Sequence, residues 1–367
     1  MTRLLAGVRV IDLSQYIPGP FAAQILADLG ADVVKVEPPD GEPMRRLGEV
    51  DEDGLTPGYK LVNAGKSVLR LDLKDEEGRR TFAELLSRAD VLVESYRPGT
   101  LERLGFGRER LAELNSGLVH VALSGWGQDG PYRLRAGHDV TYMAVGGGLA
   151  ISGTSEAPRM AFPPTADYAA AVQAALAAVA GLFHRGRGAD GMLLDVSLME
   201  TVLAWQGPSL TAAARGTPLP RAGGMISGGA AWYQVYRTAD DRFMAVGAIE
   251  HKFWHAFCGA VERPDWIARH AEPMPQHALA AEVAALFASQ PLAHWAALFD
   301  RVDCCVEPVL DPTEVPDHPH VRERGQIRAR DGLVEALFGL RVDGGPPALR
   351  APVRDVEVAE IMAAWRG

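Results

Sequence analysis

The chain has 367 residues, of which 47% are hydrophobic and 23% charged, so it can bury a large core and divide into two lobes. Its net charge of -10 argues against a nucleic-acid binder, whose affinity rests on clustered Lys and Arg, although a local basic pocket would suffice for a small polyanion. Three cysteines, two of them adjacent, suit a reducing compartment better than a disulfide framework.

The N-terminal segment favours a cytoplasmic protein. It runs directly into a strand-like stretch at residues 8–13, without a basic region followed by an apolar signal segment. No apolar run is expected to approach the length of a membrane span, so we expect neither a membrane nor a nucleic acid as partner.

The first half of the chain alternates β-branched runs with helical patterns, which is typical of βαβ units and a parallel sheet. Strands are predicted at 8–13, 32–37, 68–73, 91–94 and 118–124, and helices at 21–29 and 76–89. Pro18-Gly19-Pro20 follows the first strand where a dinucleotide-binding protein has Gly-x-Gly-x-x-Gly, so the half is Rossmann-like but NAD binding is poorly supported.

The second half predicts a smaller α+β domain. An alanine-rich helix at 168–183 is followed by a Gly/Pro-rich stretch, a hairpin at 233–248, and helices near 251–261, 277–289 and 292–301. The predicted division is a large domain of residues 1–205, completed by 325–367, a linker with a glycine-rich loop at 206–232, and a small domain at 233–324. The fold class is therefore α/β, with a final helix at 356–365 that returns to the large domain.

Three ionisable residues are candidates for acid/base chemistry: His138, Asp167 and Glu250. Asp167 stands just before the alanine-rich helix, where an N-cap is the simpler role, and Glu250 also precedes a helix. His138 lies in a loop, where a plain polar contact is the common role of a histidine. Together, an imidazole and two carboxyl groups are what an enzyme needs to remove a carbon-bound proton and return one.

Other polar residues are open to weaker interpretations. His251 and His255 have the i, i+4 spacing of zinc ligands, but no third ligand is evident and no metal is assigned. Basic residues of the first half could bind the phosphates of coenzyme A. The residues beside strand ends are the best candidates, because α/β sheets bind ligands there. These candidates are Arg46, Lys66, Lys74 and Arg97.

Read together, segments along nearly the whole chain resemble the family III CoA-transferase superfamily (CaiB/BaiF type), and within it the 2-methylacyl-CoA racemases. The resemblance is carried by Pro18-Gly19-Pro20, residues 26–37, Leu71-Asp72-Leu73-Lys74, Tyr96-Arg97-Pro98-Gly99, Ser124-Gly125-Trp126-Gly127-Gln128, Ala136-Gly137-His138-Asp139 and residues 245–250. It implies an interlocked homodimer with each active site between the large domain of one subunit and the small domain of the other. It also implies an acyl-CoA substrate and no cofactor beyond its CoA moiety.

The resemblance also implies roles for the site residues. His138 and Asp167 would exchange the α-proton of an acyl-CoA thioester, Glu250 would support His138, and the backbone N–H of Asp139 would stabilise the enolate oxygen. In a transferase, Asp167 would instead be the nucleophile that carries the acyl group as an anhydride.

Three activities remain open from the sequence. Asp167 is followed by Tyr168-Ala169-Ala170 where the racemases usually have glycines, Ser227 replaces an aspartate, and the segment 41–59 is longer than racemases carry. A CoA-transferase and a CoA-binding protein without catalysis are therefore the alternatives. His138 and Glu250, which a transferase does not need as acid/base partners, favour the racemase.

Overall fold

The structure is a computed structural model that describes residues 3–366, and it divides into two compact units. Unit 1 contains the residues up to Gly146, Ala161–Trp205 and the residues from Pro319 onward. Unit 2 contains Gly147–Met160 and Gln206–His318. Each unit has its own hydrophobic core and is described by itself.

Unit 1 is built on a seven-stranded parallel sheet with the order β12-β3-β2-β1-β4-β5-β6. The strands are β1 (Arg9–Leu13), β2 (Asp32–Glu37), β3 (Ser67–Arg70), β4 (Val91–Glu94), β5 (Val119–Ser124), β6 (Met192–Ser197) and β12 (Arg354–Asp355). The central strands are buried on both faces, which is why they read as nearly continuous apolar runs.

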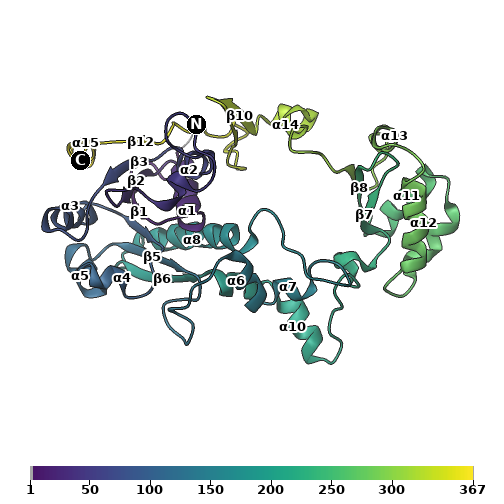
Figure 1. Cartoon of the computed structure of the whole chain (residues 1–367), viewed down its shortest axis with the longest axis horizontal. Helices are drawn as coiled ribbons and strands as arrows, with labels where there is room; N and C mark the ends of the chain where they lie inside the picture. Colours follow the sequence, from purple (N-terminus) through teal and green to yellow (C-terminus); the bar gives the residue numbers. More distant parts are fainter. Residues whose placement is uncertain (1–2, 367) are drawn as a thin grey trace. The chain divides into compact units, whose positions relative to one another are not determined.

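Helices cover both faces of this sheet (Figure 1). One face packs against α1 (Pro18–Asp28) and α8 (Thr165–Arg185), and the other against α3 (Glu76–Leu86), α5 (Arg108–Leu114) and α15 (Val358–Ala364). The shorter helices of the unit are η1 (Pro43–Arg46), α2 (Pro57–Asn63), α4 (Thr100–Arg103), α6 (Asp139–Val145), α9 (Leu198–Ala204) and α14 (Pro319–Arg324). A small hairpin of β10 (Ile327–Arg330) and β11 (Leu333–Ala336) precedes β12.

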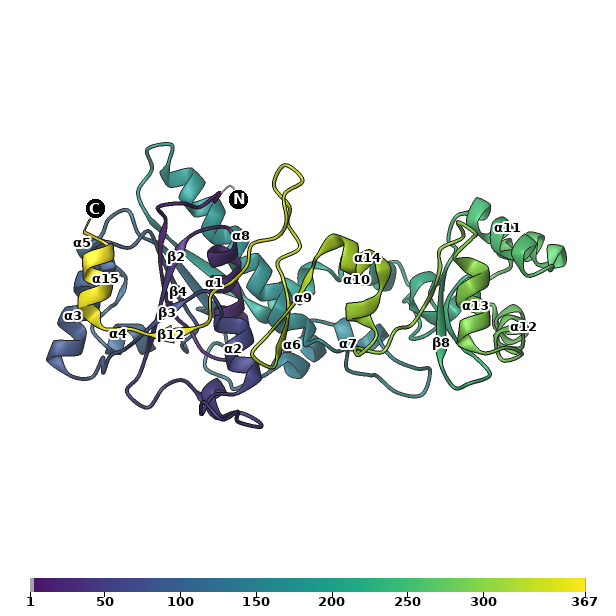
Figure 2. The same cartoon turned by 90° about the horizontal axis from the view of Figure 1, so that it is seen from above.

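The α/β fold class with a parallel central sheet is confirmed. The five predicted strands lie within about three residues of their observed bounds, whereas β6 and the two-residue β12 were missed. The final helix does return to unit 1: Ile361 and Trp365 pack with Phe82 of α3, and Trp365 Nε1 donates to Asp32 Oδ2 at 2.6 Å. Figures 1 and 2 show α15 beside α3.

Helix α8 is longer than predicted, and it begins at Thr165. By length and composition alone it could cross a membrane, so the expectation that no apolar run approaches such a length was wrong. One such helix is weak evidence for a membrane protein, because a core helix has the same composition. The alanines of α8 pack closely against α1 and the sheet, while Val172, Leu176 and Phe183 on its opposite side are exposed.

Unit 2 is a smaller α+β unit around a three-stranded antiparallel sheet. Its strands are β7 (Tyr233–Arg237), β8 (Phe243–Gly247) and β9 (Val306–Pro308), and its helical segments are α7 (Gly148–Ile151), α10 (Gly207–Ala214), η2 (Met225–Gly229), α11 (His251–Ala260), η3 (Pro264–Ala271), α12 (His277–Phe287), α13 (Leu292–Phe299) and η4 (Val315–Asp317). Trp254, Phe257 and Phe287 form the centre of its core.

The observed division differs from the predicted one in three places. Residues 147–160 belong to unit 2 although they lie within the predicted large domain. The stretch 206–232, predicted as a linker, is part of unit 2, and the return to unit 1 begins at Pro319 rather than at residue 325. Of the three cysteines, Cys258 and Cys304 are buried, whereas Cys305 is exposed.

Candidate active site

His138 and Asp167 line one cavity of ≈ 320 Å³ in unit 1, which we call the His138 cavity. It opens at the carboxyl ends of the parallel strands, where α/β sheets bind ligands. Besides these two residues, its walls are formed by Gln15, Tyr16, Pro18, Ser95, Tyr96, Arg97, Pro98, Leu123, Ser124, Gly125, Trp126, Arg133, Arg135, Ala136, Gly137, Tyr142 and Leu198.

A polar turn at the start of α6 holds His138 at the cavity. The backbone N–H of His138 donates to Thr141 Oγ1 at 3.0 Å, and this hydroxyl donates to the His138 carbonyl at 2.7 Å. The imidazole is exposed, and its ring meets that of Tyr16 edge-on with centroids 6.3 Å apart. Gly137 is required here, because a Cβ at this position would lie 2.5 Å from the Tyr142 ring.

Asp139 joins the turn of His138 to the helix that carries Asp167. Its carboxylate accepts hydrogen bonds from the backbone N–H groups of Ala166 at 2.6 Å and Asp167 at 3.3 Å. Asp139 therefore caps α8, and Asp167 lies inside the first turn, so the N-cap interpretation of Asp167 was wrong. As the first residue of α6, Asp139 also has a backbone N–H that no carbonyl of that helix can accept.

The carboxyl group of Asp167 is electrostatically perturbed. Burial raises the pKa of Asp167 from 3.8 to about 6, the nearby negative charge of Asp139 adds to this increase, and His138 opposes it. These interactions place the carboxyl group close to both residues of the turn. A carboxyl group that titrates near neutral pH can take up and release a proton under ordinary conditions.

Tyr16 reaches the cavity through a strained backbone. Its φ of 63° is rare for a residue with a side chain, and its N–H donates to Glu42 Oε2 at 3.0 Å. Glu42 is buried, and its other carboxylate oxygen lies 3.5 Å from Lys35 Nζ. The loop that presents the Tyr16 ring to His138 is thus tied to a charged cluster inside the unit.

The structure contradicts the prediction that Lys66 binds phosphate. Lys66 is only 2% exposed, and its Nζ donates to Asp12 Oδ2 at 2.8 Å, the Pro20 carbonyl at 2.7 Å and Asn63 Oδ1 at 2.8 Å. All three donors of the ammonium group are used, so none is available to a ligand. Burial lowers the pKa of Lys66 to about 8, although the charge of Asp12 opposes this shift.

The other predicted phosphate-binding residues are accessible. Arg97 is exposed and lines the His138 cavity. It also lines an adjoining cavity of ≈ 500 Å³, to which Arg108 and Arg110 contribute. Arg46 and Lys74 are exposed, and neither lines either of these two cavities among the described residues.

Glu250 belongs to unit 2, where it is the N-cap residue of α11. Its side chain is exposed at the end of β8. Burial and then the charge of Glu250 raise the pKa of the Cys305 thiol, so these side chains are neighbours. Cys305 lines a cavity of ≈ 710 Å³ together with residues of the glycine-rich segment at 226–228.

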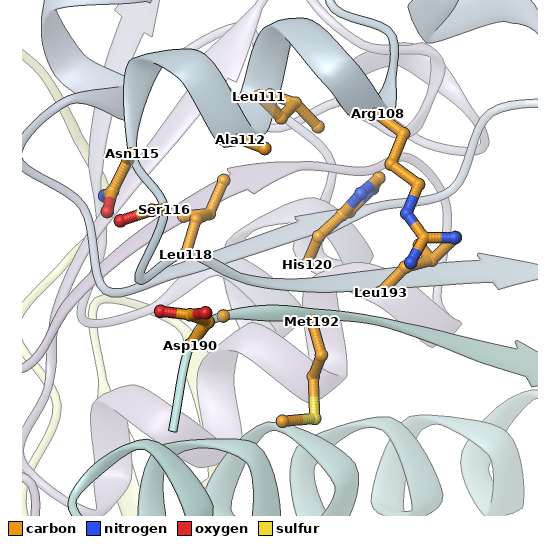
Figure 3. A pocket seen from close by; sticks show the side chains of 11 residues that line it. Arg108, Leu111, Ala112, Asn115, Ser116, Leu118, His120, Asp190, Met192 and Leu193 are labelled. Atoms are coloured by element: carbon orange, nitrogen blue, oxygen red, sulfur yellow. The ribbon is translucent and has the colours of Figure 1, made fainter. Parts of the chain in front are cut away.

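A further cavity of unit 1, of ≈ 230 Å³, lies between α5 and the strands β5 and β6 (Figure 3). Leu111 and Ala112 extend from the helix toward the strands, whereas the Met192 side chain points to the opposite side of β6, away from α5. Of the described residues that line it, none is a predicted acid/base residue. Within residues 3–366, no cluster of three or more His, Cys, Asp or Glu side chains could hold a metal ion.

Several residues of the His138 cavity were not singled out from the sequence. Tyr16, Ser124, Trp126 and Tyr142 line it; the first three lie at or shortly after the end of a strand, and Tyr142 lies in α6. Ser124 and Trp126 stood in a segment that carries the family resemblance, but no role was attached to them. The rule that ligands bind at the carboxyl ends of parallel strands could have identified Ser124 and Trp126 as candidates.

Comparisons with known proteins agree with this architecture. Residues 5–352 match the sequence model of CoA-transferase family III. The alpha-methylacyl-CoA racemase of Homo sapiens is 36% identical over 332 residues, which cover 88% of this chain and 82% of that protein. The acetyl-CoA:oxalate CoA-transferase of Acetobacter aceti is 31% identical, with 92% and 89% covered. A CaiB/BaiF family protein from Brucella suis has a similar structure, with a TM-score of 0.85, 25% identity, and 98% and 99% covered.

The chain therefore belongs to CoA-transferase family III. It is an enzyme of this superfamily, in which racemases and CoA-transferases occur at similar identity to it.

Proposed function

We propose that the enzyme racemises or epimerises 2-methyl-branched acyl-CoA thioesters. The observation that carries this proposal is the shared cavity of His138 and Asp167, in which the pKa of Asp167 is raised to about 6. A general acid or base works best when its pKa lies near the operating pH. A nucleophilic carboxylate gains nothing comparable from being half protonated.

In the proposed reaction, one of the two groups removes the α-proton of the thioester and leaves a planar enolate. The other group then delivers a proton to the opposite face, so the configuration inverts and no acyl group moves. The Asp139 N–H is assigned to the enolate oxygen, where a donor aimed at developing charge is typically worth about a hundredfold in rate. Glu250 is assigned as the carboxylate that supports the imidazole, on the family resemblance alone.

The enzyme is proposed to bind its substrate through the CoA moiety and to need no further cofactor. Arg97 is the basic residue that joins the two adjoining cavities, and Arg46 and Lys74 are exposed candidates for the phosphates. Arg97→Ala is expected to raise the Kd for acetyl-CoA more than it lowers kcat. Arg46→Ala and Lys74→Ala test in the same way whether these two residues, which line neither cavity among the described residues, also bind the phosphates.

The deciding experiment is solvent exchange. A single stereoisomer of a 2-methylacyl-CoA is incubated with the enzyme in heavy water, without any free carboxylic acid. Both stereoisomers are expected, with deuterium at the α-carbon, and His138→Ala and Asp167→Asn should abolish the exchange while acetyl-CoA still binds. Retained configuration without label in the wild-type enzyme would disprove racemisation of that substrate.

A CoA-transferase is the second candidate, because transferases such as succinyl-CoA--D-citramalate CoA-transferase of Chloroflexus aurantiacus are 36% identical over 72% of this chain. In this reaction the Asp167 carboxylate attacks the thioester carbonyl, CoA leaves as a thiolate, and an acyl anhydride remains on the enzyme. Hydroxylamine should then modify Asp167 only after addition of acyl-CoA, and turnover should require an acceptor acid.

A CoA-binding protein without catalysis is the third candidate. It would bind CoA but show no solvent exchange, no hydroxylamine trapping and no CoA transfer.

A further inference from the structure

Hydrogen-bond donors without partners are concentrated at the end of β5. Ser124 is the last residue of this strand, and Trp126 and Gln128 follow at intervals of two. Ser124 Oγ, Trp126 Nε1 and Gln128 Nε2 are all buried, and none of the three has a hydrogen-bond partner within residues 3–366. Such atoms are few in native proteins, so three in five residues need an explanation.

The neighbouring strand shows that the sheet itself can satisfy a serine at this level. Ser197 of β6 pairs directly with Ser124 in the register of the two strands. Its hydroxyl donates to the Gly125 carbonyl at 3.4 Å and accepts from the Glu200 N–H at 3.3 Å. Ser124 is 9% exposed and Ser197 is 2% exposed, so both serines are largely buried, but only the Ser197 hydroxyl has partners among the described residues.

The residues that carry these donors line the cavities in which the substrate is proposed to bind. Ser124 and Trp126 line the His138 cavity with His138 and Asp167. Gln128 lines the adjoining cavity, and the two cavities share Arg97 among their walls. The three residues thus belong to the walls of two cavities that adjoin at Arg97.

Edge-on ring contacts hold the Trp126 indole in place. The Trp126 ring meets Tyr132 and Tyr142 edge-on, with centroids 5.3 Å and 5.0 Å apart. The Arg135 guanidinium lies over the Tyr132 ring, 3.8 Å from its centroid. Gly125 permits this packing, because a Cβ there would lie 2.3 Å from Tyr142 Oη. A donor held by packing on both sides is preorganised for an acceptor.

The chemistry of these groups defines their ligand. An indole N–H only donates, so the ligand must present hydrogen-bond acceptors. An acyl-CoA carries a thioester carbonyl and two amide carbonyls along its pantetheine arm, all uncharged acceptors. Accordingly, we propose that Ser124 Oγ and Trp126 Nε1 donate hydrogen bonds to the carbonyl oxygens of this arm, with Gln128 Nε2 next along its path. This inference rests on the proposed acyl-CoA function.

The test compares Ser124→Ala and Trp126→Phe with Ser197→Ala, using acetyl-CoA and adenosine 3′,5′-bisphosphate as probes. The bisphosphate lacks the pantetheine arm. Ser124→Ala and Trp126→Phe should each raise the Kd for acetyl-CoA about tenfold and leave the Kd for the bisphosphate unchanged. Ser197→Ala should leave both Kd values unchanged.

Thermal unfolding supplies a readout that separates binding from structure. Ser124→Ala removes an unpartnered hydroxyl, so the Tm should stay the same or rise, whereas Ser197→Ala removes the N-cap of α9 and should lower it. Wild-type affinity for acetyl-CoA in both Ser124→Ala and Trp126→Phe overturns this inference alone. A wild-type enzyme that binds no acetyl-CoA overturns the proposed function as well.

Discussion

At the scale of single residues, the carboxyl pair Asp139 and Asp167 links structure to chemistry. Asp139 caps α8 with the same carboxylate whose charge helps to raise the pKa of its neighbour. One residue thus sets both the start of the helix and the proton affinity of the group proposed to act in the reaction. The two effects can be separated, because Asn caps a helix as well as Asp but carries no charge.

Asp139→Asn should therefore shift the pH dependence of kcat/KM while α8 stays capped. For the stereoisomer whose proton Asp167 removes, kcat/KM is expected to fall as the pH drops through about 6, since the carboxylate becomes protonated. Without the charge of Asp139, the pKa of Asp167 falls and this acidic limb moves to lower pH. Measurements of kcat/KM from pH 4.5 to 8 for the wild type and the variant check this shift. A folded variant whose acidic limb lies at the same pH as that of the wild type contradicts the prediction.

Asp167→Asn should stabilise the protein at neutral pH. Because burial and then Asp139 raise the pKa of Asp167 from 3.8 to about 6, the folded state holds its proton more tightly than the unfolded state. Stability is therefore lost as the pH rises between these values, and the loss is complete above about 6. The Asn side chain cannot ionise, so the variant avoids this loss of stability. Its free energy of unfolding should exceed that of the wild type by on the order of 1 to 3 kcal/mol at pH 7.5, and by less at pH 4.5. Denaturant unfolding at both pH values measures the difference, and an equal gain at both is the contrary result.

At the scale of elements, the strand ends β1 and β2 carry a buried ionic cluster. Asp12 is 0% exposed and lies 2.8 Å from Lys66 Nζ and 3.7 Å from Lys35 Nζ. Burial would raise the pKa of Asp12, but the two ammonium groups outweigh it and lower the pKa to about 2. Lys35 also donates to the Ser14 carbonyl at 2.8 Å, next to the loop of Tyr16.

Asp12→Asn should destabilise unit 1 strongly, because it leaves two buried ammonium groups without their shared carboxylate. Breaking a buried ion pair typically costs about 3 to 5 kcal/mol. Arg354→Met, which removes the exposed ion pair with Glu360, should have a much smaller effect. Urea unfolding of both variants tests this, and equal losses would show that the buried cluster contributes no more than a surface pair.

Helices and strands could be predicted from the sequence where the pattern that defines them lies within a few consecutive residues. The buried strands β1, β2 and β4 were predicted because apolar runs of their length, between turn residues, have few other interpretations. The start of α8 was misplaced because its cap, Asp139, is distant in the chain. Lys66 was misread because only the folded chain brings Asp12 to it, and the unpartnered state of Ser124 is likewise a property of tertiary structure.

At the scale of the whole molecule, we propose that the enzyme is a homodimer, as the family resemblance implies. The exposed apolar side chains of Val172, Leu176 and Phe183 on α8 are consistent with a covered surface. The resemblance further predicts that His138 and Glu250 of one site come from different subunits.

Co-expression of His138→Ala and Glu250→Ala chains tests this prediction. In a mixed dimer with composite sites, one site carries both changes and the other carries neither, so about half of the wild-type turnover should return. Sites built within single chains would leave every site with one change and restore nothing. Each variant alone, purified in the same way, is the control, and the mixed dimer is isolated with two affinity tags.

The edge strand β12 and the helix α15 also bear on how the protein is made. Both are contributed by residues beyond 353, yet β12 pairs with β3 and Trp365 bonds to Asp32 of β2. While the polypeptide is still emerging from the ribosome, the outer side of β3 has no neighbour and the apolar surface around Phe82 stays bare. Unit 1 can therefore complete its sheet and its core only after β12 and α15 have been synthesised, and until then a strand edge and an apolar surface are open to association with other chains.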